Sequence, residues 1–465
     1  MKVRVQIIVE HEGLDGPIVE EVACLCRGDL MPETLGLTLD EGKTLLAQIQ
    51  KTMVAHQAAE YVEQQRPCPD CSQRQANKGE HDIVYRTLFG RLQITSPRLY
   101  TCACQPREKG SFSPLAEVLP ERTAPELKYL QTKWASLMSY GLTVDLLEEV
   151  LPMQTNVAAV FHHLHQAAER MEGELGEEQV MFVEGCPVDW EELPLPAEPL
   201  TVGIDGGFVH AREGENRKAG WFEVIVGKSM AAEKKSKRFG FVVDYDEKPK
   251  RRLHEMLQAQ GLQMNQAITF LSDGGDTVRN LQLYLSPQAE HVLDWFHITM
   301  RITVMKQMAK GLPDHEMLKD VEGDLERVKW YLWHGNVFRA LQVMGEIEMD
   351  LQSVDCEMAG TERITKLDKT VQEFQGYIEA NGGFIPNYED RSHYGEAIST
   401  AFVESTVNEV VSRRMVKKQQ MRWTRQGAHL LLQVRNQTLN DDLRETFGRW
   451  YPAMPQAEIS TQLAA

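Results

Sequence analysis

The sequence predicts a multidomain protein of the mixed α/β class. Its 465 residues are too many for one ordinary hydrophobic core, and an apolar content of 42% is ample for two to four. Runs rich in β-branched residues also alternate with stretches of helical periodicity. No run of about 18 uncharged apolar residues occurs, and no signal peptide is evident at the N-terminus. We therefore expect a cytoplasmic protein with no membrane partner.

The N-terminal region, residues 1–65, begins with the polar and apolar alternation of a strand (MKVRVQIIVEHEG) and ends in a helical stretch. Residues 66–124 then contain two apolar runs split at Phe89 and Gly90, where the glycine indicates a hairpin turn. This second region is predicted to be a small β module.

Two cysteine pairs flank that hairpin. Two tight turns can bring four thiolates to the distance of about 2.3 Å that Zn²⁺ requires. We therefore predict a zinc-ribbon-like module with structural Zn²⁺, although the C-x-C pair departs from the common C-x-x-C spacing and buried thiols without metal are the alternative. The four predicted ligands are Cys68, Cys71, Cys102 and Cys104.

Residues 125–180 read as helical segments separated by Gly141 and Pro152, which is typical of a helix-turn-helix-like DNA-binding domain. Residues 181–199 are acidic and proline-rich without Lys or Arg, and we interpret them as a linker.

Strand signals dominate residues 200–295, where three consecutive strands precede alternating helices and strands. Residues 296–395 are mainly helical in pattern. Residues 396–450 contain a further helix with many basic residues, and residues 451–465 are expected to form a C-terminal tail.

Three carboxylates stand at the ends of these elements. Asp205 in GIDGG and Asp273 in FLSDGGD interrupt or close strand-like runs, and Glu404 opens the basic helix. Three acids without a histidine or thiolate ligand suit Mg²⁺ or Mn²⁺, and two such ions can clamp a phosphodiester. Taken singly, each Asp-Gly motif is more often a plain turn; the two together with the glutamate helix favour a metal site.

The formal net charge of −18 argues at first against a nucleic-acid partner. However, residues 228–252 and 404–435 each carry a net charge of +5 and adjoin the proposed acids. This distribution favours DNA binding near those acids. The predicted DNA-binding residues are Arg413, Arg414, Lys417, Lys418, Arg422 and Arg425.

The segments GIDGG, SDGGD, DWFH and VESTVNEVVSRRM, in this order, resemble the DDE transposases of bacterial insertion sequences. The similarity is greatest to the ISKra group, near the Mutator-like branch. RTLFGRLQITSPRLYTCAC, between the cysteine pairs, also resembles that group, so the resemblance covers nearly the whole chain. It implies an RNase H-like core whose first part is residues 200–295 and whose last part is residues 396–450, with residues 296–395 as a helical insertion before the last catalytic residue. The zinc-ribbon-like and helical modules precede this core.

The resemblance also ranks competing residues. An RNase H-like core takes its second acid from the fourth strand, which favours Asp273 over Asp294. In the resemblance, Asp294 and His297 belong to a D-x-x-H motif near the site, where His297 would contact DNA phosphate or move protons; a buried hydrogen-bonded pair is the alternative. Glu404 fits the family pattern better than Glu409, and Asn408, one helical turn on, shares its face.

The implied function is a transposase that binds the ends of its mobile element, cleaves the DNA and joins the freed 3′-hydroxyl to target DNA. Its partners would be double-stranded DNA, as terminal repeats and as target, and further copies of the chain on that DNA; its location would be nucleoid-associated. A transposase-derived DNA-binding regulator without catalysis and an RNase H-like nuclease are the alternatives. The presence of all three acids favours the enzyme.

Overall fold

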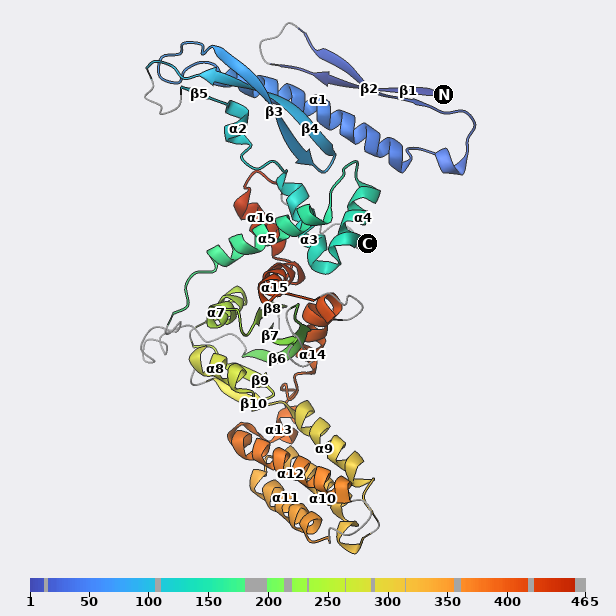
Figure 1. The fold of residues 1–465 in the computed structure, drawn as a ribbon, viewed down its shortest axis with the longest axis vertical. Helices are drawn as coiled ribbons and strands as arrows, with labels where there is room; N and C mark the ends of the chain where they lie inside the picture. The colour runs from blue at the N-terminus through green and yellow to red at the C-terminus, as the bar shows by residue number, and fades with distance from the viewer. Residues whose placement is uncertain are drawn as a thin grey trace. The chain divides into compact units, whose positions relative to one another are not determined.

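The computed structural model describes residues 1–11, 16–104, 110–179, 199–212, 220–231, 234–263, 265–285, 289–313, 315–354, 361–416 and 422–455. The chain divides into two compact units, Met1–Ala167 with Asp441–Ala465, and Ala168–Asn440. Figure 1 shows the elements of both. Apart from Pro199, the predicted acidic linker lies outside the described residues.

The first unit begins with a hairpin of β1 (Lys2–Val9) and β2 (Ile18–Cys26), followed by the long helix α1 (Leu39–Gln65). A capping box between Thr38 and Glu41 fixes the start of α1 by satisfying two otherwise unpaired backbone N–H groups. Beside it lies an antiparallel sheet of β3 (Asn77–Thr87), β4 (Gly90–Tyr100) and β5 (Ser111–Phe112).

The hairpin between β3 and β4 has the two-residue turn expected from the sequence. Thr87 pairs with Gly90, and Gly90 adopts a φ of +126°, which a residue with a side chain rarely tolerates. One face of this sheet packs on α1 through a small core formed by Val62, Ile83, Leu92, Ile94 and Leu115.

Four helices follow in the first unit: α2 (Pro114–Val118), α3 (Pro125–Leu137), α4 (Tyr140–Val150) and α5 (Val157–Glu174), the last crossing into the second unit. The C-terminal helix α16 (Leu443–Trp450) returns to pack on α3. There Phe447 meets Tyr129 edge to face at 5.5 Å, and Arg444 pairs with Glu126. The end of the 396–450 segment thus belongs to the first unit, and not to the core in which the sequence analysis placed it.

The second unit is built on a five-stranded sheet in the order β10-β9-β6-β7-β8. β6, β7 and β8 are antiparallel neighbours, whereas β9 and β10 run parallel to β6. The bounds are β6 (Leu200–His210), β7 (Trp221–Ala231), β8 (Lys234–Val242), β9 (Ile268–Ser272) and β10 (Glu290–Leu293).

Helices cover both faces of this sheet. On one face, α7 (Pro249–Ala259) and α8 (Asp276–Leu285) share a core with Val202 and Ile204. On the opposite face lie α14 (Ala401–Val407), packed on β6 and β7, and α15 (Arg425–Leu439), packed on β8.

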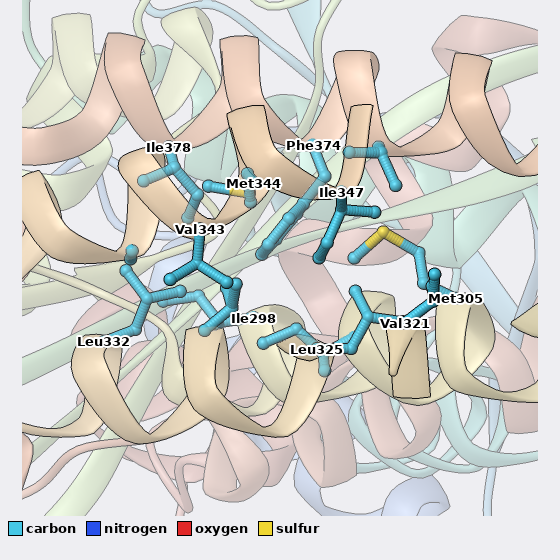
Figure 2. Packing of buried hydrophobic residues seen from close by; sticks show 14 of the residues in the cluster. Ile298, Met305, Val321, Leu325, Leu332, Val343, Met344, Ile347, Phe374 and Ile378 are labelled. Atoms are coloured by element: carbon cyan, nitrogen blue, oxygen red, sulfur yellow. The ribbon is translucent and has the colours of Figure 1, made fainter. Parts of the chain in front are cut away.

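The stretch predicted to be helical contains α9 (Trp295–Ala309), α10 (Val321–Trp333), α11 (Val337–Gln352), α12 (Thr361–Asn381) and α13 (Tyr388–His393). Figure 2 shows side chains from α9 to α12 packed together, with Phe374 and Ile347 among them, in a core that also includes Leu271 of β9 and Leu293 of β10. Two tyrosines tie this subdomain to the sheet. Tyr377 donates to the carbonyl of Asp273 at 2.9 Å, and Tyr388 to that of Leu293 at 2.7 Å.

A buried arginine organises the other side of the second unit. Arg252, on α7, is 6% exposed and its guanidinium meets both Asp246 and Glu172. It also donates to Gln433 on α15 at 3.0 Å and lies 3.0 Å from His429. Four separate segments are therefore joined through one cation.

We expect Arg252→Met to lower the thermal unfolding midpoint by roughly 10 °C, because leaving two carboxylates buried without their cation costs about 3–5 kcal/mol. Arg327→Ala is the control, since its pair with Asp324 is at the surface and contributes at most about 1 kcal/mol. Equal melting curves for the two variants would contradict the expectation.

The same cluster predicts acid sensitivity. Burial opposes ionisation of Glu172, but hydrogen bonds from His429 and Arg252 lower its pKa from 4.5 to about 2. Because this pKa is lower in the folded chain, the stabilisation is complete above about pH 4.5 and is lost as the pH falls toward 2. Melting curves across this range should fall more steeply for the wild type than for Glu172→Gln.

Candidate active site

The register of the parallel strands aligns three aspartates. Gly203 on β6 pairs with Leu271 on β9, so Asp205 and Asp273, each two residues further on, stand at the same level. Leu293 on β10 pairs with Ser272, which brings Asp294 to that level too. Adjacent strands are about 4.8 Å apart. The three aspartates are therefore level with one another in a row across neighbouring strands, with Asp205 in the middle of β6 and Asp273 and Asp294 directly after β9 and β10.

Asp294 is the most sequestered member of this row. It is fully buried and caps α9 by accepting the N–H of Phe296 at 2.8 Å. Its other oxygen accepts the Thr400 hydroxyl and lies 3.5 Å from His297 Nε2. Asp294 and His297 are therefore neighbours, as the D-x-x-H motif predicts, and both oxygens of Asp294 already have partners.

Asp205 and Asp273 are only partly buried, and each accepts fewer hydrogen bonds than Asp294 does. Asp205 accepts the N–H of Gly206 at 2.8 Å, and Asp273 accepts that of Gly275 at 3.0 Å. Among the described residues, neither carboxylate forms an ion pair with Lys or Arg. These two aspartates are thus better suited than Asp294 to hold a cation.

The electrostatics of the row favour a cation as well. Burial raises the pKa of Asp205, and the charges of Asp273 and Asp294 act in the same direction, while the Gly206 N–H and His297 oppose the shift. A divalent ion between the carboxylates would relieve this repulsion. An acid-only donor set is one that Mg²⁺ or Mn²⁺ prefers, but the ligand oxygens of these three described aspartates do not all lie within 4.8 Å of one another.

The glycines after the aspartates make room for protein atoms. A Cβ on Gly274, whose φ is +83°, would lie 2.5 Å from Asn381 Oδ1 and 2.9 Å from Leu293 Cδ1. On Gly207 it would lie 3.0 Å from Val407 of α14. The sequence pattern does not distinguish such close packing from space reserved for a ligand.

Glu404 lies on the helix that covers Asp205. Gly203, Asp205 and Gly207 alternate onto one face of β6. A Cβ on Gly203 would lie 2.1 Å from Val403 Cγ2. Since Val403 meets Gly203 and Val407 meets Gly207, α14 runs along β6 in the same direction, with Asp205 between these contacts.

The side of α14 that carries Glu404 follows from handedness. A right-handed helix turns about 100° per residue, so Glu404 points away from Val403 toward one flank of α14. Given the usual right-handed crossover from β9 to β10, that flank is the one nearer β9 and Asp273. Glu404 is exposed and not in contact with the row; the ligand oxygens of the three predicted acids are not gathered within 4.8 Å of one another.

This packing predicts that Gly203→Ala destabilises the second unit by about 1–3 kcal/mol, because the added methyl overlaps Val403 and must displace α14. A lower thermal midpoint would show the effect. Gly345→Ala on α11 is the matched control, since a Cβ there has no heavy atom within 4 Å and should be neutral or slightly stabilising. Recovery of stability in Gly203→Ala/Val403→Ala would assign the loss to this contact.

The chain continues from α14 as a π-helix, Asn408–Val416. Glu409, the alternative to Glu404, accepts from Arg238 on β8 at 3.2 Å. The backbone carbonyls of Glu409 and Val410 accept from the buried Arg435. Asn408, the first residue of this helix, is partly buried. Glu409 therefore has a structural partner, which leaves Glu404 as the acid available to a ligand.

The predicted DNA-binding residues divide into three groups. Arg413, Arg422 and Arg425 are exposed, although Arg425 lies 3.7 Å from Asp244. Arg414 is fully buried, with its guanidinium 5.3 Å from the centre of the Trp423 ring, and does not reach the surface. Lys417 and Lys418 lie outside the described residues.

The four predicted zinc ligands form a tight cluster that can bind a metal such as zinc. Cys68 Sγ lies 3.4 Å from Cys104 Sγ, and Cys71 Sγ lies 3.5 Å from Cys102 Sγ. A tetrahedral zinc site separates its sulfurs by about 3.8 Å, whereas a disulfide separates them by about 2.05 Å. The observed spacing therefore matches ligands around one ion, and the four thiols are free.

The local fold supports this cluster. The Ser72 N–H donates to the carbonyl of Cys68 at 2.8 Å, closing a tight turn in which Ser72 has a φ of +59°. Burial of Cys68 opposes its ionisation, but the N–H groups of Cys71 and Asp70 lower its pKa to about 7, which favours the thiolate.

A second group of potential ligands, not anticipated from the sequence, comprises Glu172, Asp246 and His429. Arg252 already pairs with both carboxylates and lies 3.0 Å from His429. The group is therefore explained by an internal ion pair. Its members are 74 and 183 residues apart along the chain, as their numbers show, so no local motif marks them.

Comparison with models of known protein families and with curated proteins found no match. Within the described residues, none of the helices combines the length and apolar character needed to cross a membrane.

Proposed function

We propose that this protein is a metal-dependent enzyme that cleaves and joins DNA strands, of the DDE transposase type. The observation that carries the proposal is the register that brings Asp205 on β6 level with Asp273 at the end of β9, with the helix of Glu404 packed over β6. Two acids from neighbouring strands and one from the covering helix are the residue set that the sequence resemblance implies, although their ligand oxygens are not gathered within 4.8 Å of one another in this structure.

The strand order supports the same proposal. Three antiparallel strands followed by parallel strands that alternate with helices match the order expected of an RNase H-like core. The helices from α9 to α13 separate Asp294 from Glu404, as expected of a helical insertion before the last catalytic residue.

Each residue then has a defined part. Asp205 would be shared by two divalent ions, with Asp273 and Glu404 each holding one; such ions would supply charge stabilisation and a deprotonated nucleophile. Asp294 orients His297 through its buried carboxylate, and His297 is positioned to contact a phosphate oxygen or move a proton. Arg413 and Arg422 would contact the DNA backbone.

The test combines labelled DNA from the flanks of the coding region, a target plasmid and Mg²⁺. A transposase yields both cleaved ends and products joined to the plasmid. A nuclease yields cleavage alone, and a regulator yields a shifted band in a binding gel with neither product. EDTA should abolish both reactions.

A further inference from the structure

Two histidines from different elements of the first unit face each other beside the β1–β2 hairpin. His11 lies two residues after the end of β1, and His56 lies in the second half of α1. His11 Nε2 and His56 Nδ1 are 3.1 Å apart, and the ring centres are 5.2 Å apart. Only 16% and 19% of these side chains are exposed. We call these two residues the histidine pair.

A carboxylate lies beside the outer nitrogen of each ring. His11 Nδ1 is 3.4 Å from Glu60 Oε2, and His56 Nε2 is 3.4 Å from Glu20 Oε1. Glu20 belongs to β2, and its other oxygen accepts the hydroxyl of Thr52 at 3.0 Å. A histidine that binds a metal commonly donates its second N–H to a carboxylate, which fixes the orientation of the ring. Both rings of the pair already have such a partner.

These contacts require a cation between the rings. A neutral imidazole carries a single N–H, and each ring of the pair directs its outer nitrogen at a carboxylate. When both N–H groups are on the outer nitrogens, the two inner lone pairs face each other at 3.1 Å and repel unless a positive ion lies between them. That ion is either a shared proton or a metal ion bound by both nitrogens.

The charge of the cluster favours a divalent metal over a proton. Glu20 and Glu60, with two neutral imidazoles, carry a net charge of −2, which one divalent ion neutralises and one proton does not. Among the described residues, neither glutamate forms an ion pair with Lys or Arg that could supply this charge.

The distance between the inner nitrogens is also suitable for a metal. Zn–N bonds of about 2.0–2.1 Å at the tetrahedral angle place two ligand nitrogens about 3.3–3.4 Å apart. The observed 3.1 Å is within a few tenths of an ångström of this value. Imidazole suits Zn²⁺, Cu²⁺ and Ni²⁺, whereas Mg²⁺ prefers oxygen ligands. Within the described part of the chain, the groups of three or more gathered ligands do not include the pair, so water would complete the coordination.

We propose that the histidine pair binds one divalent transition-metal ion, such as Zn²⁺, through His11 Nε2 and His56 Nδ1. The ion would fasten the β1–β2 hairpin to α1, with Glu20 and Glu60 orienting the two rings from outside. A two-stranded hairpin is marginally stable by itself, so such a link would stabilise this part of the first unit. The site is separate from the four-cysteine cluster and does not depend on the proposed function.

Zinc binding can be measured on the full chain after dialysis against citrate. An ion held by only two side chains should be lost in this step, whereas four cysteine ligands should retain theirs. Elemental analysis checks that one zinc remains, and a titration with Zn²⁺ by isothermal calorimetry should then show one further ion per chain.

His11→Ala and His56→Ala should each weaken the binding of this further ion by more than about 100-fold. Glu20→Gln and Glu60→Gln retain the shape of the side chain and should weaken it by about 10- to 100-fold, as expected for partners that only orient a ligand. His162→Ala is the control, because His162 is an exposed histidine on α5 of the same unit. It should leave the titration unchanged.

Saturating Zn²⁺ should also raise the thermal unfolding midpoint of the citrate-treated wild type, since an ion that binds only the folded chain stabilises it. The rise should disappear in His11→Ala/His56→Ala and persist in His162→Ala. A wild-type chain that takes up no further Zn²⁺ would overturn the proposal and assign the cation between the rings to a proton. Uptake with wild-type affinity by the double alanine variant would overturn it as well, because the ion would then bind elsewhere.

Discussion

Asp205→Asn should reduce Mg²⁺-dependent DNA cleavage by on the order of 10²–10³-fold or more while leaving DNA binding unchanged. The amide keeps the shape of the side chain and its acceptor for Gly206, but it removes the charge that a divalent ion requires. Asp273→Asn and Glu404→Gln should have effects of similar size. Cleavage of labelled duplexes in gels, with binding measured in parallel, provides the readout.

Glu409→Gln is the matched control for Glu404→Gln, because the two acids lie five residues apart and Glu409 is engaged by Arg238. We expect it to alter stability slightly and cleavage far less than Glu404→Gln. Normal cleavage by any one of the three acid variants would exclude that residue from the metal site. If Glu409→Gln were inactive and Glu404→Gln active, Glu409 would be the acid that binds the metal, and the assignment of Glu404 would be wrong.

Purified protein should contain one zinc ion per chain. Cys68→Ser should lower the zinc affinity by more than about 100-fold, because loss of a residue that only supports a ligand already lowers the affinity by up to about 100-fold. Cys68 is 1% exposed and is the most buried ligand of the cluster, so the local turn should also lose stability. Elemental analysis and the release of zinc to a chromogenic chelator measure the two effects. Metal binding and folding are coupled in such small modules.

Cys24→Ser is the control, since Cys24 is an exposed free thiol on β2 outside the cluster. It should leave the zinc content unchanged. Protein that carries no zinc after expression with ample metal would falsify the zinc assignment, and an unchanged zinc content in Cys68→Ser would remove this residue from the ligand set.

The features that the sequence predicts best are those fixed by local patterns. Asp205 and Asp273 interrupt or end β-branched runs, and the structure forms β6 and β9 at these runs and pairs them in parallel. The spacing of the two cysteine pairs likewise predicted the four-cysteine cluster that the structure contains. The preference for Asp273 over Asp294 rested on strand order; the structure adds a physical reason, since Asp294 is buried with both oxygens engaged.

The basic segments were harder to interpret, because a sequence does not show which distant acid a cation will meet. Arg252 lies in a run of positive charge, yet it is buried against Glu172, 80 residues away along the chain. Arg238 pairs with Glu409, and Arg435 donates hydrogen bonds to backbone carbonyls of the π-helix. Charge counting therefore overstated the exposed basic surface near the acids. It had no means of detecting the return of α16 to the first unit, which depends on contacts such as that of Phe447 with Tyr129.

The hydrogen bonds of Tyr377 and Tyr388 couple the helical subdomain to the ends of β9 and β10. Their hydroxyls donate to the carbonyls of Asp273 and Leu293, so a tilt of α12 or α13 would displace the peptide units that carry Asp273 and Asp294. Any movement of these helices would therefore change the spacing of the two aspartates, and Tyr377→Phe is the change that would remove the link at Asp273.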